Sequence, residues 1–488
     1  MKKDQPNPFT KLDCLILTII VVVAMVARLY KINTPLADLH SWRQADTAAV
    51  GRNFVRFGFD FLHPRYDDLS SNQSAAGLDN PQGLRFVEFP IYNAIFAYAY
   101  KLLPVLPIEV YGRLTTAFFS LIIIGVIYFL ALKEANRLAA FFAAATYAVF
   151  PFFVFFSRVV LPETTATAFS LLAVFFLYLY SDRKGLAAGI SFFLSVVSFA
   201  AAVLIMPTAG FYGLVLLFIF FKKFRFHFIK KWPVYLFFII ALIPFAWWRL
   251  YIRQFPEGIP PSEWLLTSVN TYQGLQNIFF RPAFFRWIFF ERINNLMLGG
   301  YLTFFLLLGA LVRPKRWILH SVLFSALIYL FTFQGGNVQH EYYQTIALPA
   351  IALFVGVGAA YLFTIRKLFV HPIINAGVVL FVFAISLFFS FYNVRGFYDY
   401  PAELPQIAKI INILTAPTDK IVTDRLGDTT LLYLADRRGA PSIYKDPAVL
   451  AKMGYSYLAT LNQGEINTLK QQKYPVVFEN NQFALFKL

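Results

Sequence analysis

The sequence predicts an all-α polytopic membrane protein that ends in a small α/β extracytoplasmic domain, and three observations lead to this prediction. Hydrophobic residues make up 58% and charged residues 14% of the chain, whereas soluble domains have about 45–50% and about 25%. The apolar residues gather into about eleven segments, most of them close to the roughly 20 residues that a membrane span needs. After Val394 the composition becomes that of a soluble domain.

Short polar links set the limits of the apolar segments. The first segment follows Lys2, Lys3 and Lys11. It is too long for the core of a signal peptide and lacks a small-residue cleavage site, so we expect it to remain as an anchor. The sixth segment is the shortest, so its ends are the least clearly marked. The expected spans are residues 16–31, 114–132, 138–156, 164–180, 186–205, 208–221, 233–251, 293–312, 317–334, 347–365 and 373–392.

Basic residues alternate between successive links, which predicts how the chain crosses the membrane. With a cytoplasmic N-terminus, the short outside links 157–163, 206–210 and 335–346 hold one basic residue, Arg158. The inside links are basic, as the positive-inside rule requires. We therefore interpret the net charge of +17 as a topology signal and not as evidence for a nucleic-acid partner. The inside links hold Lys133 and Arg137; Arg183 and Lys184; Lys222, Lys223, Arg225, Lys230 and Lys231; Arg313, Lys315 and Arg316; Arg366 and Lys367.

Residues 89–105 are apolar enough to be taken for another span. Counting them would invert every later segment and move the basic links outside, so we expect an interfacial helix on the outer surface. The membrane domain is then residues 1–392, with a long outside loop at 32–113 and a second one at 252–292.

Residues 393–488 are expected to form the soluble extracytoplasmic domain. Strands and helices alternate along it, which is typical of a small α/β sandwich. It has no glycine-rich phosphate loop, so we assign it no catalysis. The expected elements are a helix at 402–414, a strand at 419–424, a helix at 429–436, a strand at 456–460 and a final hairpin turning at Asn480 and Asn481.

The first outside loop begins with a cluster of polar groups. Asp38, His40, Arg43 and Asp46 lie within nine residues, and a helix is predicted from Trp42 onward. The alternative is an ordinary solvated loop with a helix N-cap at Asp38 or Ser41. Further along, Glu88 precedes the interfacial helix. An acid at this place can also have a purely structural role, because a negative charge interacts favourably with the N-terminal end of the helix dipole.

Two short outside links add further candidates. Arg158 is the single cation that departs from the threading rule, which suggests an anionic partner such as a phosphate, although it could simply snorkel. Glu163 begins the next span and could simply cap it. In the third link, His340, Glu341, Tyr342 and Tyr343 could form an aromatic belt. Together these loops would gather over one outward cavity that holds a phosphate while a carboxylate activates a hydroxyl.

These motifs, HSWRQADTAAVGRNF, FSRVVLPE and HEYYQTIALP with the soluble tail, resemble the bacterial membrane glycosyltransferases of the GT-C fold, in the group of protein mannosyltransferases and the lipid A aminoarabinose transferase. The resemblance covers most of the membrane part. It implies a polyprenyl-phosphate-linked sugar as donor, entering from the outer leaflet of a bacterial inner membrane. It also implies an acid in the first outside loop as catalytic base, with another acid or polar group in the loop that holds Glu163.

The chain departs from its apparent relatives at one place. Many of them carry an adjacent Asp-Glu pair after the first span, where this chain has Arg43 and Gln44. Asp38 and Asp46 flank that place, and we favour Asp38 as the base because it lies closest to the membrane, with Asp46 second. Arg158, helped by His340 and Tyr343, would neutralise charge on the departing phosphate. The substrate-binding candidates are His40, Arg43, Glu88, Arg158, His340, Glu341, Tyr342 and Tyr343.

Two other classes of protein remain open from the residues. A transporter or flippase of lipid-linked substrates would show repeated halves and ionisable groups near the midplane, whereas here the spans are almost free of charge. An assembly subunit would tolerate substitutions between Asp38 and Asp46. No cofactor is assigned; a divalent metal could lie between Asp38, Asp46 and Glu163, but their spacing matches no recognised ligand motif.

Overall fold

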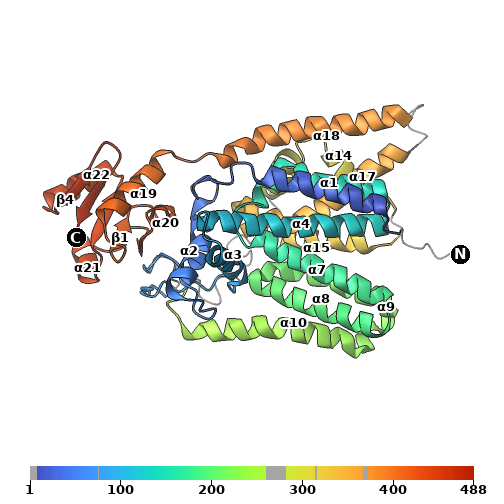
Figure 1. The fold of residues 1–488 in the computed structure, drawn as a ribbon, viewed down its shortest axis with the longest axis horizontal. Helices are drawn as coiled ribbons and strands as arrows, with labels where there is room; N and C mark the ends of the chain where they lie inside the picture. The colour runs from blue at the N-terminus through green and yellow to red at the C-terminus, as the bar shows by residue number, and fades with distance from the viewer. Residues whose placement is uncertain (1–7, 75, 260–281, 314–315, 366–371) are drawn as a thin grey trace. The chain divides into compact units, whose positions relative to one another are not determined.

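The computed structural model describes residues 8–74, 76–259, 282–313, 316–365 and 372–488, and Figure 1 shows the chain. The chain divides into two compact units. The helical unit consists of Met1–Ile32, Leu114–Trp247 and Leu265–Gly396. The loop–tail unit consists of Asn33–Arg113, Trp248–Trp264 and Phe397–Leu488.

The helical unit is built from apolar helices, and each expected apolar segment contains helix. The expected span 293–312 is interrupted by a turn at residues 298–302. Its α-helices are α1 (Lys11–Arg28), α4 (Ile108–Glu134, which begins in the other unit), α5 (Arg137–Val149), α6 (Pro151–Phe156), α7 (Glu163–Asp182), α8 (Gly185–Ile205), α9 (Gly213–Phe224), α10 (Trp232–Tyr251), α13 (Pro282–Phe285), α14 (Thr303–Leu311), α15 (Ile318–Thr332), α16 (Gln334–Gln339), α17 (Leu348–Thr364) and α18 (Pro372–Val394). Between them lie the 3-10 helices η1 (Pro207–Tyr212), η2 (Arg225–Lys230) and η6 (Glu341–Ala347), and a π-helix, η5 (Arg286–Met297).

Within the described residues, six helices are long and apolar enough to cross a membrane, by length and composition alone. They are Ile108–Glu134, Glu163–Asp182, Gly185–Ile205, Trp232–Gln254, Glu341–Thr364 and Ile373–Leu414. Two shorter apolar helices, Arg137–Val149 and Ile318–Thr332, accompany them. The protein is therefore a membrane protein, as the composition predicts, while the number of spans stays a prediction.

Small residues allow the helices of this unit to approach closely. Helix α17 packs against α5 and α14. A Cβ on Gly358 would meet the backbone carbonyl of Phe305, and one on Gly309 would meet that of Phe354. Such close approach is typical of membrane helices, whose association depends on van der Waals packing.

In the loop–tail unit, the long outside loop forms two helices, α2 (Ser41–Phe57) and α3 (Ile91–Leu102), which pack together. The 12 residues of α3 give about 18 Å of helix, well short of the about 30 Å of a bilayer core. Its length thus agrees with the expectation that residues 89–105 do not form a span. Residues 260–281 of the second expected outside loop lie outside the described residues. A short 3-10 helix, η3 (Ile252–Gln254), follows α10.

The tail folds around a five-stranded sheet. Its strands, β1 (Lys420–Thr423), β2 (Arg438–Ala440), β3 (Tyr457–Thr460), β4 (Val476–Glu479) and β5 (Ala484–Lys487), lie in the order β2-β1-β3-β5-β4. The first three pair in parallel and the last two form an antiparallel hairpin. The helices are η7 (Arg395–Tyr398), α19 (Glu403–Leu414), α20 (Thr430–Leu434), α21 (Pro447–Lys452) and α22 (Gln463–Gln471). The expected strands, helices and hairpin are confirmed, whereas β2, α21 and α22 were not predicted.

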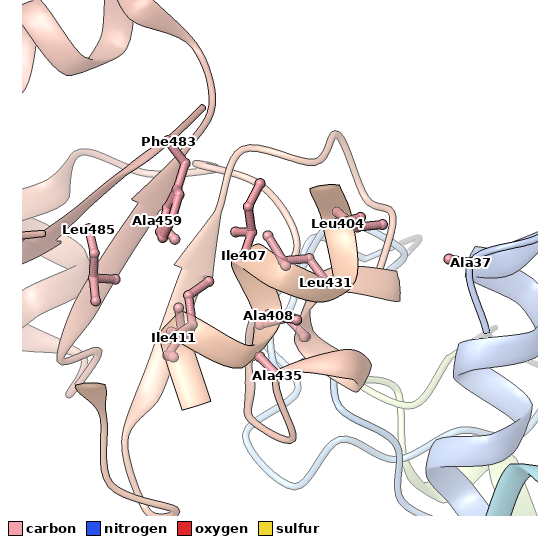
Figure 2. Packing of buried hydrophobic residues seen from close by; sticks show 12 residues of the cluster. Ala37, Leu404, Ile407, Ala408, Ile411, Leu431, Ala435, Ala459, Phe483 and Leu485 are labelled. Carbon is pink, nitrogen blue, oxygen red and sulfur yellow. The ribbon is translucent and has the colours of Figure 1, made fainter. Parts of the chain in front are cut away.

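Alternate residues of the strands enter two apolar cores, as the period of two in a strand requires. Ile421, Ala459 and Leu485 pack with residues of α19 and α20, as Figure 2 shows for the labelled side chains. Val422 and Leu458 belong to the second core, which includes residues of α21 and α22. The tail is therefore a helix–sheet–helix sandwich.

The loop contributes to the same compact unit as the tail. Ala37 belongs to the first of these cores, and the N–H of Leu69 donates to the carbonyl of Gly439 at 2.7 Å. Asp68 and Gly439 also form a parallel β-bridge. The observed division therefore groups residues 33–113 with the tail. The division into a membrane domain, residues 1–392, and a soluble extracytoplasmic domain, residues 393–488, stays a prediction.

Candidate active site

Asp38 lies just before α2 and is buried, with 2% exposure. The side chain of Gln44, from the first turns of α2, donates from Nε2 to Asp38 Oδ1 at 2.7 Å and to the carbonyl of Leu39 at 2.9 Å. Arg113 places its Nη2 3.6 Å from Asp38 Oδ2. The carboxylate is therefore oriented by an amide donor and faced by a guanidinium.

The neighbouring candidates shape the start of α2. His40 is the N-cap residue of the helix and has a left-handed backbone with φ 58°. Arg43 forms an ion pair with Glu88, and the two side chains are only 5% and 10% exposed. Because Glu88 precedes α3, this pair joins the beginnings of two helices that pack together.

Asp46 lies in the middle of α2 among buried groups from three segments. Its Oδ2 is 3.0 Å from Arg85 Nη1, and its Oδ1 accepts a hydrogen bond of 2.6 Å from Thr429 Oγ1. Burial raises the pKa of Asp46, against the opposing effect of Arg85 and Thr429. Burial also raises the pKa of nearby Asp68 to about 7, against hydrogen bonds from Ser70, and Asp46 adds to this increase.

In the helical unit, Arg158 and Glu163 lie on either side of the turn between α6 and α7 and are buried. Arg158 Nη1 donates to the carbonyls of Tyr30 and Lys31 at 2.7 and 2.9 Å, which attaches this turn to the end of the first apolar segment. Both α6 and α7 contact η6. The first and third short outside links, 157–163 and 335–346, are thus brought together.

The third link holds a cluster of rings, in which His340 stacks on Tyr342 and Tyr343 is tilted against Tyr342. The ring centroids of His340 and Tyr342 are 5.2 Å apart, and those of Tyr342 and Tyr343 are 4.5 Å apart. Glu341 forms an ion pair with Arg292 at 3.0 Å. The carbonyl of Tyr343 accepts a hydrogen bond of 2.8 Å from Tyr329.

The candidates therefore fall into two groups, one in each unit. Asp38, His40, Arg43, Asp46 and Glu88 belong to the loop–tail unit. Arg158, Glu163, His340, Glu341, Tyr342 and Tyr343 belong to the helical unit. The single cavity expected to contain both groups stays a prediction.

Sequence reasoning missed the partners that hold the candidate acids. Gln44 was noticed only as a departure from a family pattern, while Arg113 is the last residue of the predicted outside loop 32–113. Arg85 and Thr429 are 39 and 383 residues from Asp46 along the chain. Arg292 is the last residue of the second expected outside loop. Only Gln44 carried a local signal, because its side chain is six residues from Asp38 and at the start of a predicted helix.

Comparisons with known proteins agree with this architecture. Residues 90–248 match the family model described as dolichyl-phosphate-mannose-protein mannosyltransferase. No curated protein sequence matches the chain.

Solved structures resemble nearly the whole chain. ArnT from Cupriavidus metallidurans bound to undecaprenyl phosphate is 15% identical, with a TM-score of 0.64 over 96% of this chain and 97% of that one. Its apo state gives 14% identity and a TM-score of 0.66, over 97% of each chain. The Archaeoglobus fulgidus oligosaccharyltransferase in the apo form is 13% identical, with a TM-score of 0.60 over 92% of this chain and 70% of that one. The archaeal oligosaccharyltransferase AglB from Archaeoglobus fulgidus, in complex with an inhibitory peptide and a dolichol-phosphate, is 10% identical, with a TM-score of 0.59 over 92% of this chain and 70% of that one. With its bundle of apolar helices and small C-terminal sheet, this chain has the GT-C fold of membrane glycosyltransferases.

Proposed function

We propose that this protein is an integral membrane glycosyltransferase that transfers a sugar from a polyprenyl-phosphate donor to an extracytoplasmic acceptor by an inverting displacement. One observation carries the proposal: in a chain of GT-C fold, the first long loop holds a buried carboxylate, Asp38, between Gln44 and Arg113. The similar structures support the donor class, because one contains undecaprenyl phosphate and another a dolichol-phosphate.

In the proposed reaction, Asp38 accepts the proton of an acceptor hydroxyl. The hydroxyl oxygen attacks the anomeric carbon and forms the new glycosidic bond. The bond between that carbon and the phosphate oxygen breaks, and the lipid phosphate departs with the bonding electrons. Arg158, with His340 and Tyr343, would stabilise the charge that develops on this phosphate, because fixed donors in a poorly hydrated site lower such barriers most. Asp46 is the second candidate for the base, and Glu163 the second acid.

The remaining candidates would position the substrates. His40 and the Arg43–Glu88 pair shape the start of α2 beside Asp38. In the third link, Tyr342 lies between the rings of His340 and Tyr343, and Glu341 is held by Arg292. Among the described residues, no group of three His, Cys, Asp or Glu side chains is arranged to hold a metal ion. No step of the proposal is assigned to a metal.

The charge pattern of the links supports the proposed location. Basic links on one side and nearly uncharged links on the other favour a multi-pass bacterial inner-membrane protein whose loop–tail unit lies outside. A donor entering from the outer leaflet would then meet the loop that carries Asp38.

The proposal can be tested with purified protein, labelled polyprenyl-phosphate sugars and extracted envelope material as the acceptor source. Asp38→Asn should reduce transfer about 10²–10⁴-fold, the usual contribution of a general base, while the protein remains folded. Asp79→Asn is a matched control, because Asp79 lies in the same loop but pairs with Lys445 at a half-exposed site. Full transfer by both Asp38→Asn and Asp46→Asn would refute the carboxylate-base proposal.

A further inference from the structure

A cleft lies where α2 ends and the loop turns back, wholly inside the loop–tail unit. Its cavity volume is about 70 Å³, which makes it a small cleft at the surface of this unit. One wall carries polar groups and another carries rings. The lining residues are Asn53, Phe54, Phe57, Gly58, Asp60, His63 and Arg65.

Asn53 gives the polar wall a buried acceptor. Its side chain is 2% exposed, and its Nδ2 donates to the carbonyl of Arg65 at 3.0 Å. Its Oδ1 has no hydrogen-bond partner within the described part of the chain. A buried carbonyl without a donor costs about 1–3 kcal/mol, so a ligand that brings a hydroxyl into the cleft would recover this energy.

A hydrogen-bonded chain fixes the imidazole of His63. Asp60 Oδ2 lies 2.8 Å from His63 Nδ1, and His63 Nε2 lies 2.9 Å from the hydroxyl of Tyr251. The N–H groups of Leu62 and His63 donate to Asp60 Oδ1 at 3.1 and 3.2 Å. Burial acts to raise the pKa of Asp60, but these hydrogen bonds outweigh it and leave the pKa lowered. Asp60 is therefore ionised and preorganised as an acceptor.

The other wall presents an aromatic surface. Phe57 is 53% exposed, whereas Phe54 is buried at 3% and stacks on Phe59 with 5.4 Å between ring centroids. The guanidinium of Arg438 lies 5.6 Å from the centroid of Phe57, which holds the ring in place. An exposed ring of this kind offers an apolar platform beside the hydrogen-bonding groups.

We propose that this cleft binds one neutral pyranose ring of a glycan acceptor, an inference that rests on the proposed glycosyltransferase function. The C–H face of the sugar would lie on Phe57, and its hydroxyls would donate to Asn53 and Asp60. The ionised carboxylate of Asp60 would repel an anionic occupant such as a phosphate. A cleft of about 70 Å³ admits no more than one sugar ring.

Binding can be measured by saturation-transfer NMR on the full-length protein in detergent, with the methyl glycosides of glucose, galactose, mannose and N-acetylglucosamine as probes. At least one glycoside should bind wild type, and Phe57→Ala or Asp60→Asn should weaken it by about tenfold, the effect of losing about 1.4 kcal/mol. Asp60→Asn keeps the Oδ1 oxygen that accepts hydrogen bonds from the N–H groups of Leu62 and His63, so the turn should be preserved. Tyr400→Ala is the control, because Tyr400 is 37% exposed in the same unit but does not line the cleft.

The outcomes separate this proposal from the proposed function. Asp38→Asn should bind the glycoside as wild type does, since Asp38 does not line the cleft. Glycoside binding without sugar transfer would refute the transferase alone. The cleft proposal is overturned if none of the four glycosides binds, if both cleft variants bind as tightly as Tyr400→Ala, or if inorganic phosphate binds and competes with the glycosides.

Discussion

Thr429 donates a hydrogen bond of 2.6 Å to Asp46, although 383 residues separate them along the chain. Asp46 lies on α2 in the first outside loop, and Thr429 immediately precedes α20 in the tail. Arg85 faces the other oxygen of the same carboxylate. A candidate catalytic acid of the loop is therefore held in part by a tail residue, which assigns the tail a structural role in shaping the loop.

Removing the Thr429 hydroxyl should destabilise the protein. Thr429→Val takes the donor from a buried carboxylate, and hydrogen bonds to charged groups contribute about 1.5–3 kcal/mol. We expect a lower Tm in a thermal unfolding experiment on the purified protein. Thr429→Ser keeps the hydroxyl and is the control. Equal Tm values for the two variants would show that this hydrogen bond contributes nothing to stability.

Stability should also depend on pH through Asp68. Its pKa is about 7 in the folded protein, above the ordinary value of 3.8, chiefly because of burial. The folded state therefore holds the proton more tightly than the unfolded state. The contribution of Asp68 to stability is therefore most favourable below about pH 4 and falls between about pH 4 and 7. Above pH 7 the burial of the ionised group costs at most about 4 kcal/mol.

The test of this dependence is the Tm of wild type and of Asp68→Asn across this pH range. The variant stays neutral, and its Oδ1 can still accept from Ser70, which bonds that atom through its N–H at 2.8 Å and its hydroxyl at 2.6 Å. Its Tm should fall less than that of wild type as pH rises. Part of the slope should remain, because burial also raises the pKa of Asp46. Identical slopes would contradict the assignment to Asp68.

Local patterns were enough to predict most of the fold. Apolar runs identified the helices of the helical unit, because a long apolar segment inside a membrane must form its backbone hydrogen bonds within a helix. Alternation and turn residues found β1, β3 and the hairpin at Asn480. Strand β2 was missed because it has only three residues, Arg438–Ala440, with an arginine and a glycine that do not favour a strand. Its place comes from pairing with β1.

The candidate site was harder to predict because its contacts are distant along the chain. Charge patterning selected the outside loops that carry Asp38, Arg158 and Glu341, since basic residues concentrate in the inside links. It gave no means of naming the partners, such as Thr429 for Asp46. Pairings of this kind depend on how the loop and tail fold together, which no local pattern encodes.

The Arg43–Glu88 pair should show strong coupling. Glu88→Ala leaves a guanidinium buried without its partner, which typically costs about 3–5 kcal/mol. Replacing both residues, as Arg43→Met with Glu88→Leu, should cost less than the sum of the single changes. Chemical or thermal unfolding of the four proteins gives the coupling. The exposed pair Lys470–Glu479, at 2.7 Å, is the control, and Glu479→Ala should cost about 0–1 kcal/mol.

Gln44 should act as a positioning residue for Asp38 if Asp38 is the base. Its Nε2 donates hydrogen bonds to Asp38 Oδ1 at 2.7 Å and to the carbonyl of Leu39. Gln44→Met removes both, so the carboxylate would be free to turn away from the acceptor hydroxyl. Misplacement of a catalytic group by about 1 Å can cost about 10²-fold in rate. We therefore expect kcat to fall about 10–100-fold with little change in KM for donor or acceptor. Gln82→Met, at an exposed glutamine of the same unit, should change neither constant. A loss confined to KM would place Gln44 in substrate binding instead, and an unchanged kcat would remove it, and the orientation argument for Asp38, from the mechanism.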